Sequence, residues 1–139
     1  TVRRRVAEPL PPAMRGPADV VSYLRTLFER LDAATEAFVV LALNAKNRIT
    51  SWKVISIGTL MATTVHPREV FAYAITARAA GIVLAHNHPS GDPEPSDIDL
   101  DLTRRLVAVG EIVGIRVLDH VVLGNDAHVS MLDRGLIVL

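Results

Sequence analysis

The sequence contains no cysteine among its 139 residues. This absence excludes disulfide bonds, thiolate metal ligands and cysteine nucleophiles. An excess of either charge is also absent, because 15 Lys and Arg residues balance 15 Asp and Glu residues. A large nucleic-acid surface needs surplus positive charge, and a base-stacking surface needs aromatic residues, which make up only 4% of the chain. We therefore do not expect this domain alone to bind nucleic acid.

Long apolar runs are missing as well. No run reaches the ~18 residues that a membrane-spanning helix needs, and the segment from Thr1 to Arg5 lacks the apolar stretch of a signal peptide. We expect a cytoplasmic protein without membrane contact and, since the sequence does not begin with Met, a processed or shortened chain. With 50% hydrophobic and 22% charged residues, the composition is typical of a single globular domain.

The first sixteen residues are predicted to form a lead-in to the domain. Three consecutive arginines are followed by three prolines and a glycine, which disfavour regular structure. This segment is either a linker to something upstream or a basic arm that contacts phosphate. We favour the linker, because three arginines are few for a phosphate-binding tail. The lead-in then covers residues 1–16, and the folded domain covers residues 17–139.

Apolar periodicity predicts alternating helices and strands. Helices are expected where apolar residues recur every three to four positions, and buried strands where short runs are almost wholly apolar. Three helices are expected: one over about 17–32, one from His66 to a stop at Gly81, and one from Ser96 to a stop at Gly110. The expected strands cover 36–43, 48–57, 82–86, 115–123 and 127–131, with a last short strand at 136–139. This order predicts an α/β fold with three layers, α-β-α, around a mixed sheet.

Two histidines and an aspartate carry the strongest chemical signal. His86 and His88 stand at the end of a buried strand, where residues two apart share a face. A loop rich in Pro and Gly follows, and Asp99 falls in the first turn of the helix that Ser96 opens. A short loop can bring this carboxylate back over the strand end. Three protein ligands with a fourth position left to water are typical of catalytic zinc, and two nitrogen ligands favour zinc over magnesium.

The same residues also have plain structural interpretations. A single histidine is usually a surface residue or a satisfied core residue, but two at this spacing would be desolvated without a partner. Ser96 and Asp99 are spaced as in a capping box, a role that is compatible with ligation by Asp99. Glu36 opens the apolar run 36–43 and is either a partly buried general base or a solvated acid at a strand end.

Five further residues have less distinctive surroundings. Asp92 lies in the loop after the histidines, where it is solvated, organises the loop or orients a ligand histidine. His66 precedes a proline and is expected at a helix entry. We do not expect His120 or His128, in the last two strands, to be metal ligands. Trp52 is expected to serve packing or an interface.

The motif His86-x-His88-Pro89 followed by Ser96-x-x-Asp99 resembles the signature of the JAMM metalloproteases, which are MPN or JAB domains. The segment 86–96 is similar, more narrowly, to the bacterial RadC-like branch, the UPF0758 family. Further similar blocks lie at 43–48, 58–60, 66–71 and 119–120, so the resemblance covers about residues 17–134. It implies the MPN/JAB fold, which resembles that of cytidine deaminases.

The resemblance implies a role for each matching residue. His86, His88 and Asp99 correspond to the family's ligands for one Zn²⁺ per chain, with a water as the fourth ligand. Glu36 corresponds to the glutamate that takes a proton from this water, and Ser96 to the serine that helps to stabilise the oxyanion. The implied reaction is hydrolysis of a peptide or isopeptide amide bond in a peptide or protein substrate.

The chain also departs from its relatives. Ubiquitin-cleaving members carry insertions near the site, whereas the connections here are short, so deubiquitination is not implied. RadC-like proteins usually also have an N-terminal helix-hairpin-helix segment, and we expect this sequence to start after that segment. The link to DNA repair follows the family's name. Two alternatives to an enzyme remain, a non-catalytic module that binds metal or a partner protein, and an accessory domain in DNA repair. Long apolar strands also leave a homodimer open.

Overall fold

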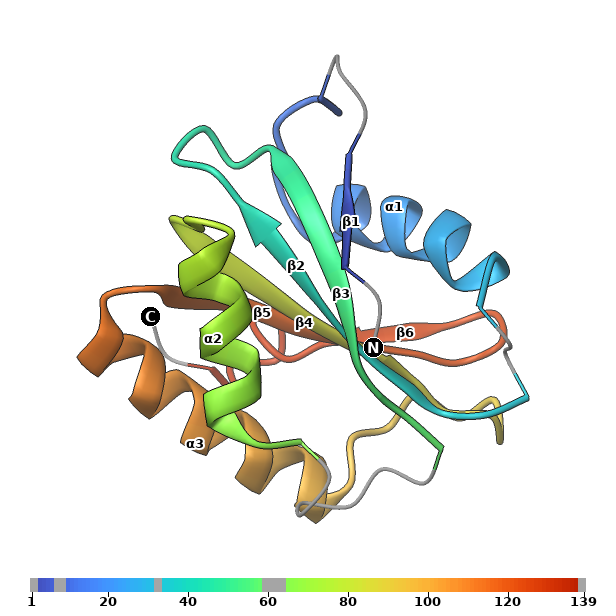
Figure 1. Cartoon of the computed structure of the whole chain (residues 1–139). Coiled ribbons are helices and arrows are strands. Elements are labelled where there is room, and N and C mark those ends of the chain that lie inside the picture. The colour runs from blue at the N-terminus through green and yellow to red at the C-terminus, as the bar shows by residue number, and fades with distance from the viewer. Residues whose placement is uncertain (1–2, 7–9, 32–33, 59–64, 138–139) are drawn as a thin grey trace.

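The computed structural model describes residues 3–6, 10–31, 34–58 and 65–137 (Figure 1). In this part of the chain one sheet has the strand order β1-β3-β2-β4-β5-β6. The strands are β1 (Arg3–Arg5), β2 (Ala37–Leu43), β3 (Ile49–Ile57), β4 (Gly81–Asn87), β5 (Arg116–Leu123) and β6 (His128–Ser130), and the helices are α1 (Pro17–Glu29), α2 (Pro67–Thr76) and α3 (Asp97–Val113). The sheet is mixed, because β4 and β5 are parallel and the other neighbours are antiparallel.

Helices cover both faces of the sheet, which confirms the predicted α-β-α layers (Figure 1). Successive residues of β2 point to opposite faces, so Phe38 and Val40 pack under α2 and α3 while Val39 and Leu41 pack under α1. The central strands β2 and β4 are buried along their whole length. Burial on both faces explains why these strands read as continuous apolar runs. None of the described helices combines the length and apolar character that crossing a membrane requires.

The parallel pairing of β4 and β5 determines where the start of α3 lies. Parallel neighbours need a crossover connection, and here α3 supplies it. The chain therefore leaves the carboxyl end of β4, passes through a loop over residues 88–96 and enters α3 at the same end of the sheet. This connection places the first turn of α3 beside the last residues of β4.

The end of α3 differs from the prediction. The helix passes Gly110 and continues to Val113, and Gly114 then caps it in the left-handed conformation with φ of 85°. Gly110 has another purpose, since a Cβ atom there would lie only 2.5 Å from the carbonyl oxygen of Ile115. Close packing of two backbone segments, rather than helix termination, accounts for this glycine.

Three other element ends also differ from the prediction. The second helix ends at Thr76, well before Gly81, because Arg78 takes the left-handed conformation with φ of 53°. Gly81 instead begins β4. Helix α1 ends at Glu29, and residue 32, where the prediction ended it, lies outside the described residues. Of the strand predicted at 136–139, the first two residues lie in no strand and the last two are outside the described part.

Part of the lead-in belongs to the sheet. Arg3–Arg5 form β1, which pairs antiparallel with β3, so the expectation of irregular structure is wrong for these three residues. Backbone bonds continue the attachment, from the amide of Val6 to the carbonyl of Thr50. An edge strand offers unpaired backbone groups, which a short segment can satisfy whatever its side chains.

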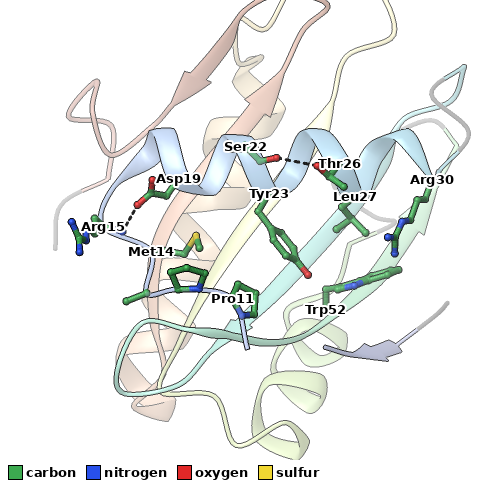
Figure 2. A pocket seen from close by; sticks show the side chains of 12 residues that line it. Pro11, Met14, Arg15, Asp19, Ser22, Tyr23, Thr26, Leu27, Arg30 and Trp52 are labelled. Carbon is green, nitrogen blue, oxygen red and sulfur yellow. Dashed lines mark hydrogen bonds between the residues drawn. The ribbon is translucent and has the colours of Figure 1, made fainter. Parts of the chain in front are cut away.

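A groove of about 550 Å³ lies between residues 11–15, helix α1 and Trp52 of β3 (Figure 2). Tyr23 and Trp52 line it together with Arg15 and Arg30. Both aromatic residues also pack against the apolar cluster beneath α1, which agrees with the packing role expected for Trp52. The groove lies on the α1 side of the sheet, on the face opposite to α3.

Candidate metal centre

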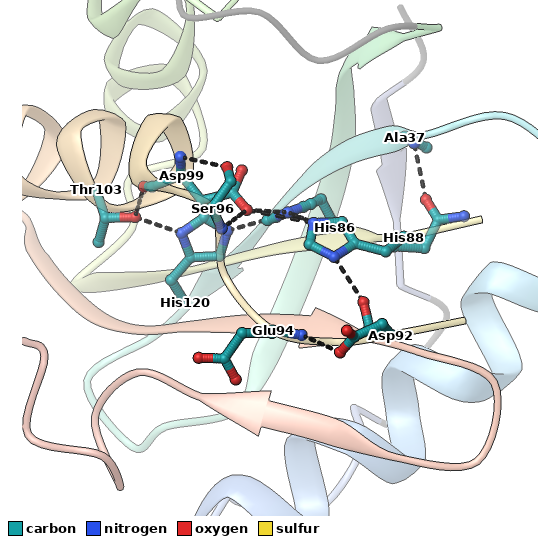
Figure 3. Close-up of polar contacts among 10 residues, drawn as sticks. Ala37, His86, His88, Asp92, Glu94, Ser96, Asp99, Thr103 and His120 are labelled. Carbon is teal, nitrogen blue, oxygen red and sulfur yellow. Dashed lines mark hydrogen bonds and ion pairs between the residues drawn. The ribbon is translucent and has the colours of Figure 1, made fainter. Parts of the chain in front are cut away.

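Three potential ligand atoms meet at the carboxyl end of β4 (Figure 3). Nε2 of His86 lies 3.0 Å from Nε2 of His88. Oδ2 of Asp99 lies 3.3 Å from the first of these atoms and 3.2 Å from the second. The structure thus brings together the three side chains that the sequence predicts as ligands.

Sheet and helix geometry place these side chains. His86 is opposite Phe38 of β2, and its ring stacks on the phenyl ring at a centroid distance of 6.1 Å. At the start of α3 the hydroxyl of Ser96 accepts from the backbone amide of Asp99 at 3.1 Å, and the amide of Ser96 donates to Oδ2 of Asp99 at 2.8 Å. The predicted capping box is confirmed. The carboxylate that completes it also faces the histidines, so the two roles expected for Asp99 are compatible.

The loop after β4 orients the ring of His88. Its Nδ1 donates to the backbone carbonyl of Asp92 at 2.8 Å, and because a carbonyl only accepts, the proton is on Nδ1. In the neutral ring, Nε2 then carries a lone pair. The Asp92 carboxylate accepts from the amide of Glu94 at 3.0 Å and so shapes the loop. Asp92 thus orients a candidate ligand, through its backbone rather than its carboxylate.

The chemistry of the three atoms fits a cation. Imidazole nitrogens and a carboxylate oxygen are all electron-pair donors, and His86 and Asp99 are only 0% and 3% exposed. Electron-pair donors that converge in a buried place are stabilised by a cation between them. Zinc bound tetrahedrally at ~2.0–2.1 Å from its ligands places them about 3.3–3.4 Å apart, close to the separations here. The residues present therefore fit a zinc ion.

The carboxylate of Asp99 is held in its ionised form. Burial raises its pKa, whereas hydrogen bonds from Ser96 lower it, and a hydrogen bond and charge from His86 lower it further when that imidazole is doubly protonated. They hold the pKa of Asp99 well below its usual range. An ionised carboxylate is the form that ligates a metal.

Glu36 immediately precedes β2. Two residues further along the chain, Phe38 pairs with the candidate ligand His86 in the antiparallel ladder of β2 and β4. Glu36 is half-buried, and its backbone carbonyl accepts from the amide of Gly58 at 2.8 Å. The backbone thus places Glu36 at this end of the sheet, and its role as a base stays a prediction.

Sequence reasoning missed two buried residues beside the site. His120 of β5 is correctly outside the ligand set, but its Nε2 lies 2.7 Å from Nδ1 of His86. Its Nδ1 lies 2.6 Å from the hydroxyl of Thr103 on α3. A signal was present, since a histidine followed directly by the apolar residues Val121, Val122 and Leu123 needs a polar partner when buried. The identity of that partner depends on tertiary contacts. The other two histidines, His66 and His128, lie outside the cluster.

A three-layer α-β-α domain with two histidines and an aspartate gathered at the end of a central strand is of the JAB or MPN class. The chain belongs to the family of RadC-like JAB domains, which its residues 14–136 match.

Relatives named UPF0758 protein support this assignment. The chain is 51% identical over 110 residues to one from Syntrophotalea carbinolica, covering 78% of the chain and 48% of the relative. It is 48% identical over 124 residues to one from Desulforamulus reducens, covering 89% and 54%, and 49% identical over 126 residues to one from Rubrobacter xylanophilus, covering 91% and 54%. The chain spans about half the length of these relatives.

Proposed function

We propose that this domain is a zinc-dependent hydrolase that cleaves an amide bond, peptide or isopeptide, in a cytoplasmic peptide or protein substrate. The observation that carries the proposal is the convergence of two imidazole nitrogens and a carboxylate oxygen at the end of β4. His86, His88 and Asp99 would hold one zinc ion. When bound, zinc lowers the pKa of a coordinated water and polarises a carbonyl group.

Glu36 is the proposed general base. Its carboxylate takes a proton from the attacking water and returns it to the nitrogen of the leaving amine. Support comes from the position of Glu36 directly before β2, whose Phe38 pairs with the candidate ligand His86. Glu36 is half-buried, so part of the residue stays accessible to a substrate.

Ser96 is the proposed donor to the oxyanion. Its oxygen already accepts from the amide of Asp99, and this bond does not use the hydroxyl proton. The proton can therefore be donated to the oxygen on which charge develops during attack. Ser96 is exposed, so a substrate carbonyl can approach it.

The test is cleavage of an unbiased peptide library by the purified, zinc-loaded chain, with and without a chelator. We expect chelator-sensitive cleavage that returns when zinc is restored. The Glu36→Gln variant should keep its zinc and lose cleavage. Cleavage that persists in this variant would assign the base elsewhere, and cleavage that persists without metal would contradict the proposal. A chain that holds zinc but cleaves nothing would favour the non-catalytic metal-binding module over the enzyme.

A further inference from the structure

A chain of buried polar contacts runs from His86 through β5 to α3 (Figure 3). Nδ1 of His86 lies 2.7 Å from Nε2 of His120, and Nδ1 of His120 lies 2.6 Å from Oγ1 of Thr103. Oγ1 of Thr103 donates in turn to the carbonyl oxygen of Asp99 at 2.7 Å. None of these four residues is more than 3% exposed. Water therefore cannot substitute for a missing partner in this chain.

The last acceptor in this chain of hydrogen bonds, the carbonyl of Asp99, fixes the direction of all the others. A backbone carbonyl only accepts, so the hydroxyl proton of Thr103 is committed to Asp99. The hydroxyl oxygen must then accept from Nδ1–H of His120. In a neutral ring this leaves Nε2 of His120 as an acceptor, and Nδ1–H of His86 donates to it. Nε2 of His86 is left with its lone pair toward His88 and Asp99.

The same contacts tie the two candidate ligands on β4 and α3 together. On one side, Nε2 of His86 and Oδ2 of Asp99 lie 3.3 Å apart, and on the other side His120 and Thr103 connect the two residues through hydrogen bonds. Ring packing fixes His120 further, since the phenyl ring of Phe38 contacts its ring edge-on at a centroid distance of 5.6 Å. The ring of His86 thus has little freedom to rotate or to move its proton.

We infer that His120 and Thr103 are positioning residues that hold His86 in the single tautomer able to bind a metal through Nε2. The inference rests on the metal site of the proposed function and extends it to two residues outside the ligand set. Partners of this kind, which bond to the second nitrogen of a ligating histidine, typically contribute about 10–100-fold to metal affinity.

Zinc affinity, measured by competition with a chelator of known affinity, tests the inference. Thr103→Val keeps the shape of the side chain but removes the acceptor for His120, and we expect about 10–100-fold weaker binding. Thr103→Ser keeps the hydroxyl and should bind zinc like the wild type. Thr26→Val is the matched control, because Thr26 makes the same hydroxyl bond to the carbonyl four residues earlier, on the exposed side of α1. Equal affinity in the Thr103→Val variant and the wild type would overturn the inference.

Nitrogen-15 NMR of the metal-free chain separates this inference from the proposed function. At pH 8, where imidazoles are ordinarily neutral, the wild type should show His86 with its proton on Nδ1, and Thr103→Val should show a mixture of tautomers. This signature does not depend on metal, and a loss of stability alone would not produce it. A wild type with this tautomer but without zinc affinity would contradict the proposed function and leave the positioning intact. A wild type that binds zinc but has the proton of His86 on Nε2 would overturn the inference alone.

Discussion

The side-chain oxygen of Asn87 accepts from the backbone nitrogen of Ala37 at 2.8 Å. Its side-chain nitrogen donates to the carbonyl of Thr35 at 3.1 Å. These two bonds hold the chain on both sides of Glu36 against the end of β4. The residue between the two candidate ligand histidines thus fixes the backbone that carries the proposed base.

Replacing Asn87 by Ala should separate metal binding from turnover. We expect the Asn87→Ala variant to bind zinc normally and to cleave about 10²-fold more slowly, since displacements near 1 Å have effects of this size. Asn44→Ala is the matched control, because the side chain of Asn44 also makes two bonds to the backbone, both accepted from the amides of Lys46 and Arg48, at the opposite end of β2. Steady-state cleavage and zinc content check the prediction. Equal slowing in both variants would show a general loss of stability instead.

Ser96 should show two separable contributions. Ser96→Ala removes the cap of α3 and should lower the free energy of unfolding by about 1 kcal/mol. Ser96→Asn restores a capping acceptor but not the hydroxyl, so stability should return while cleavage stays slow. Denaturant titration and cleavage assays on both variants check this pair of outcomes. Full activity in Ser96→Asn would remove the serine from the proposed reaction.

The turn between β5 and β6 should influence zinc binding from a distance. A Cβ atom on Gly124 would lie 2.3 Å from the carbonyl oxygen of Gly91, in the loop whose Asp92 carbonyl orients His88. Gly124→Ala should displace this loop, weaken zinc binding and lower the free energy of unfolding by about 1–3 kcal/mol. Gly16→Ala is the control, since nothing lies within 4 Å of a Cβ there. Unchanged zinc affinity in Gly124→Ala would mean that the loop does not support the site.

Asp119 should make stability depend on pH. Burial raises its pKa above 3.8, although hydrogen bonds from Ser130, Leu132 and His120 oppose the shift. The folded state therefore binds this proton more tightly than the unfolded state. The tighter binding of this proton stabilises the folded state fully below pH 3.8, and this stabilisation is lost as the pH rises through the raised pKa.

Denaturant titration of the wild type and Asp119→Asn, at steps from pH 4 to pH 7, tests this sign. The free energy of unfolding of the wild type, relative to the variant, should fall as the pH rises. Asp126→Asn, in the exposed turn between β5 and β6, should show no such trend against the wild type. A wild type that gains stability relative to Asp119→Asn as the pH rises would contradict the predicted direction of the pKa shift of Asp119.

Local patterns made much of the fold and the site predictable. The continuous apolar runs of β2 and β4 follow from burial on both faces of the sheet. The spacing from Ser96 to Asp99 gives a capping box, which is a purely local arrangement. The separation of His86 and His88 by two positions puts both on one face of a strand. The crossover from β4 through α3 then brings Asp99 next to them.

Features that depend on distant contacts were not predictable. Gly110 signals a helix end locally, but its purpose is the close approach of Ile115. The pairing of β1 with β3 satisfies backbone groups, so the side chains of β1 give no pattern that predicts a strand. His120 and Thr103 become partners only because β5 packs against α3. No spacing rule connects them to His86.

The most direct test of the central claim is the amount of zinc that the chain binds at equilibrium, measured after removal of loosely held metal. The account predicts one zinc per chain in the wild type and loss of zinc in Asp99→Asn, which keeps an oxygen for the capping box but lacks the charge. Asp97→Asn, an exposed acid in the same helical turn, should bind like the wild type. Equal zinc content in Asp99→Asn and the wild type, or no zinc in either, would contradict the account.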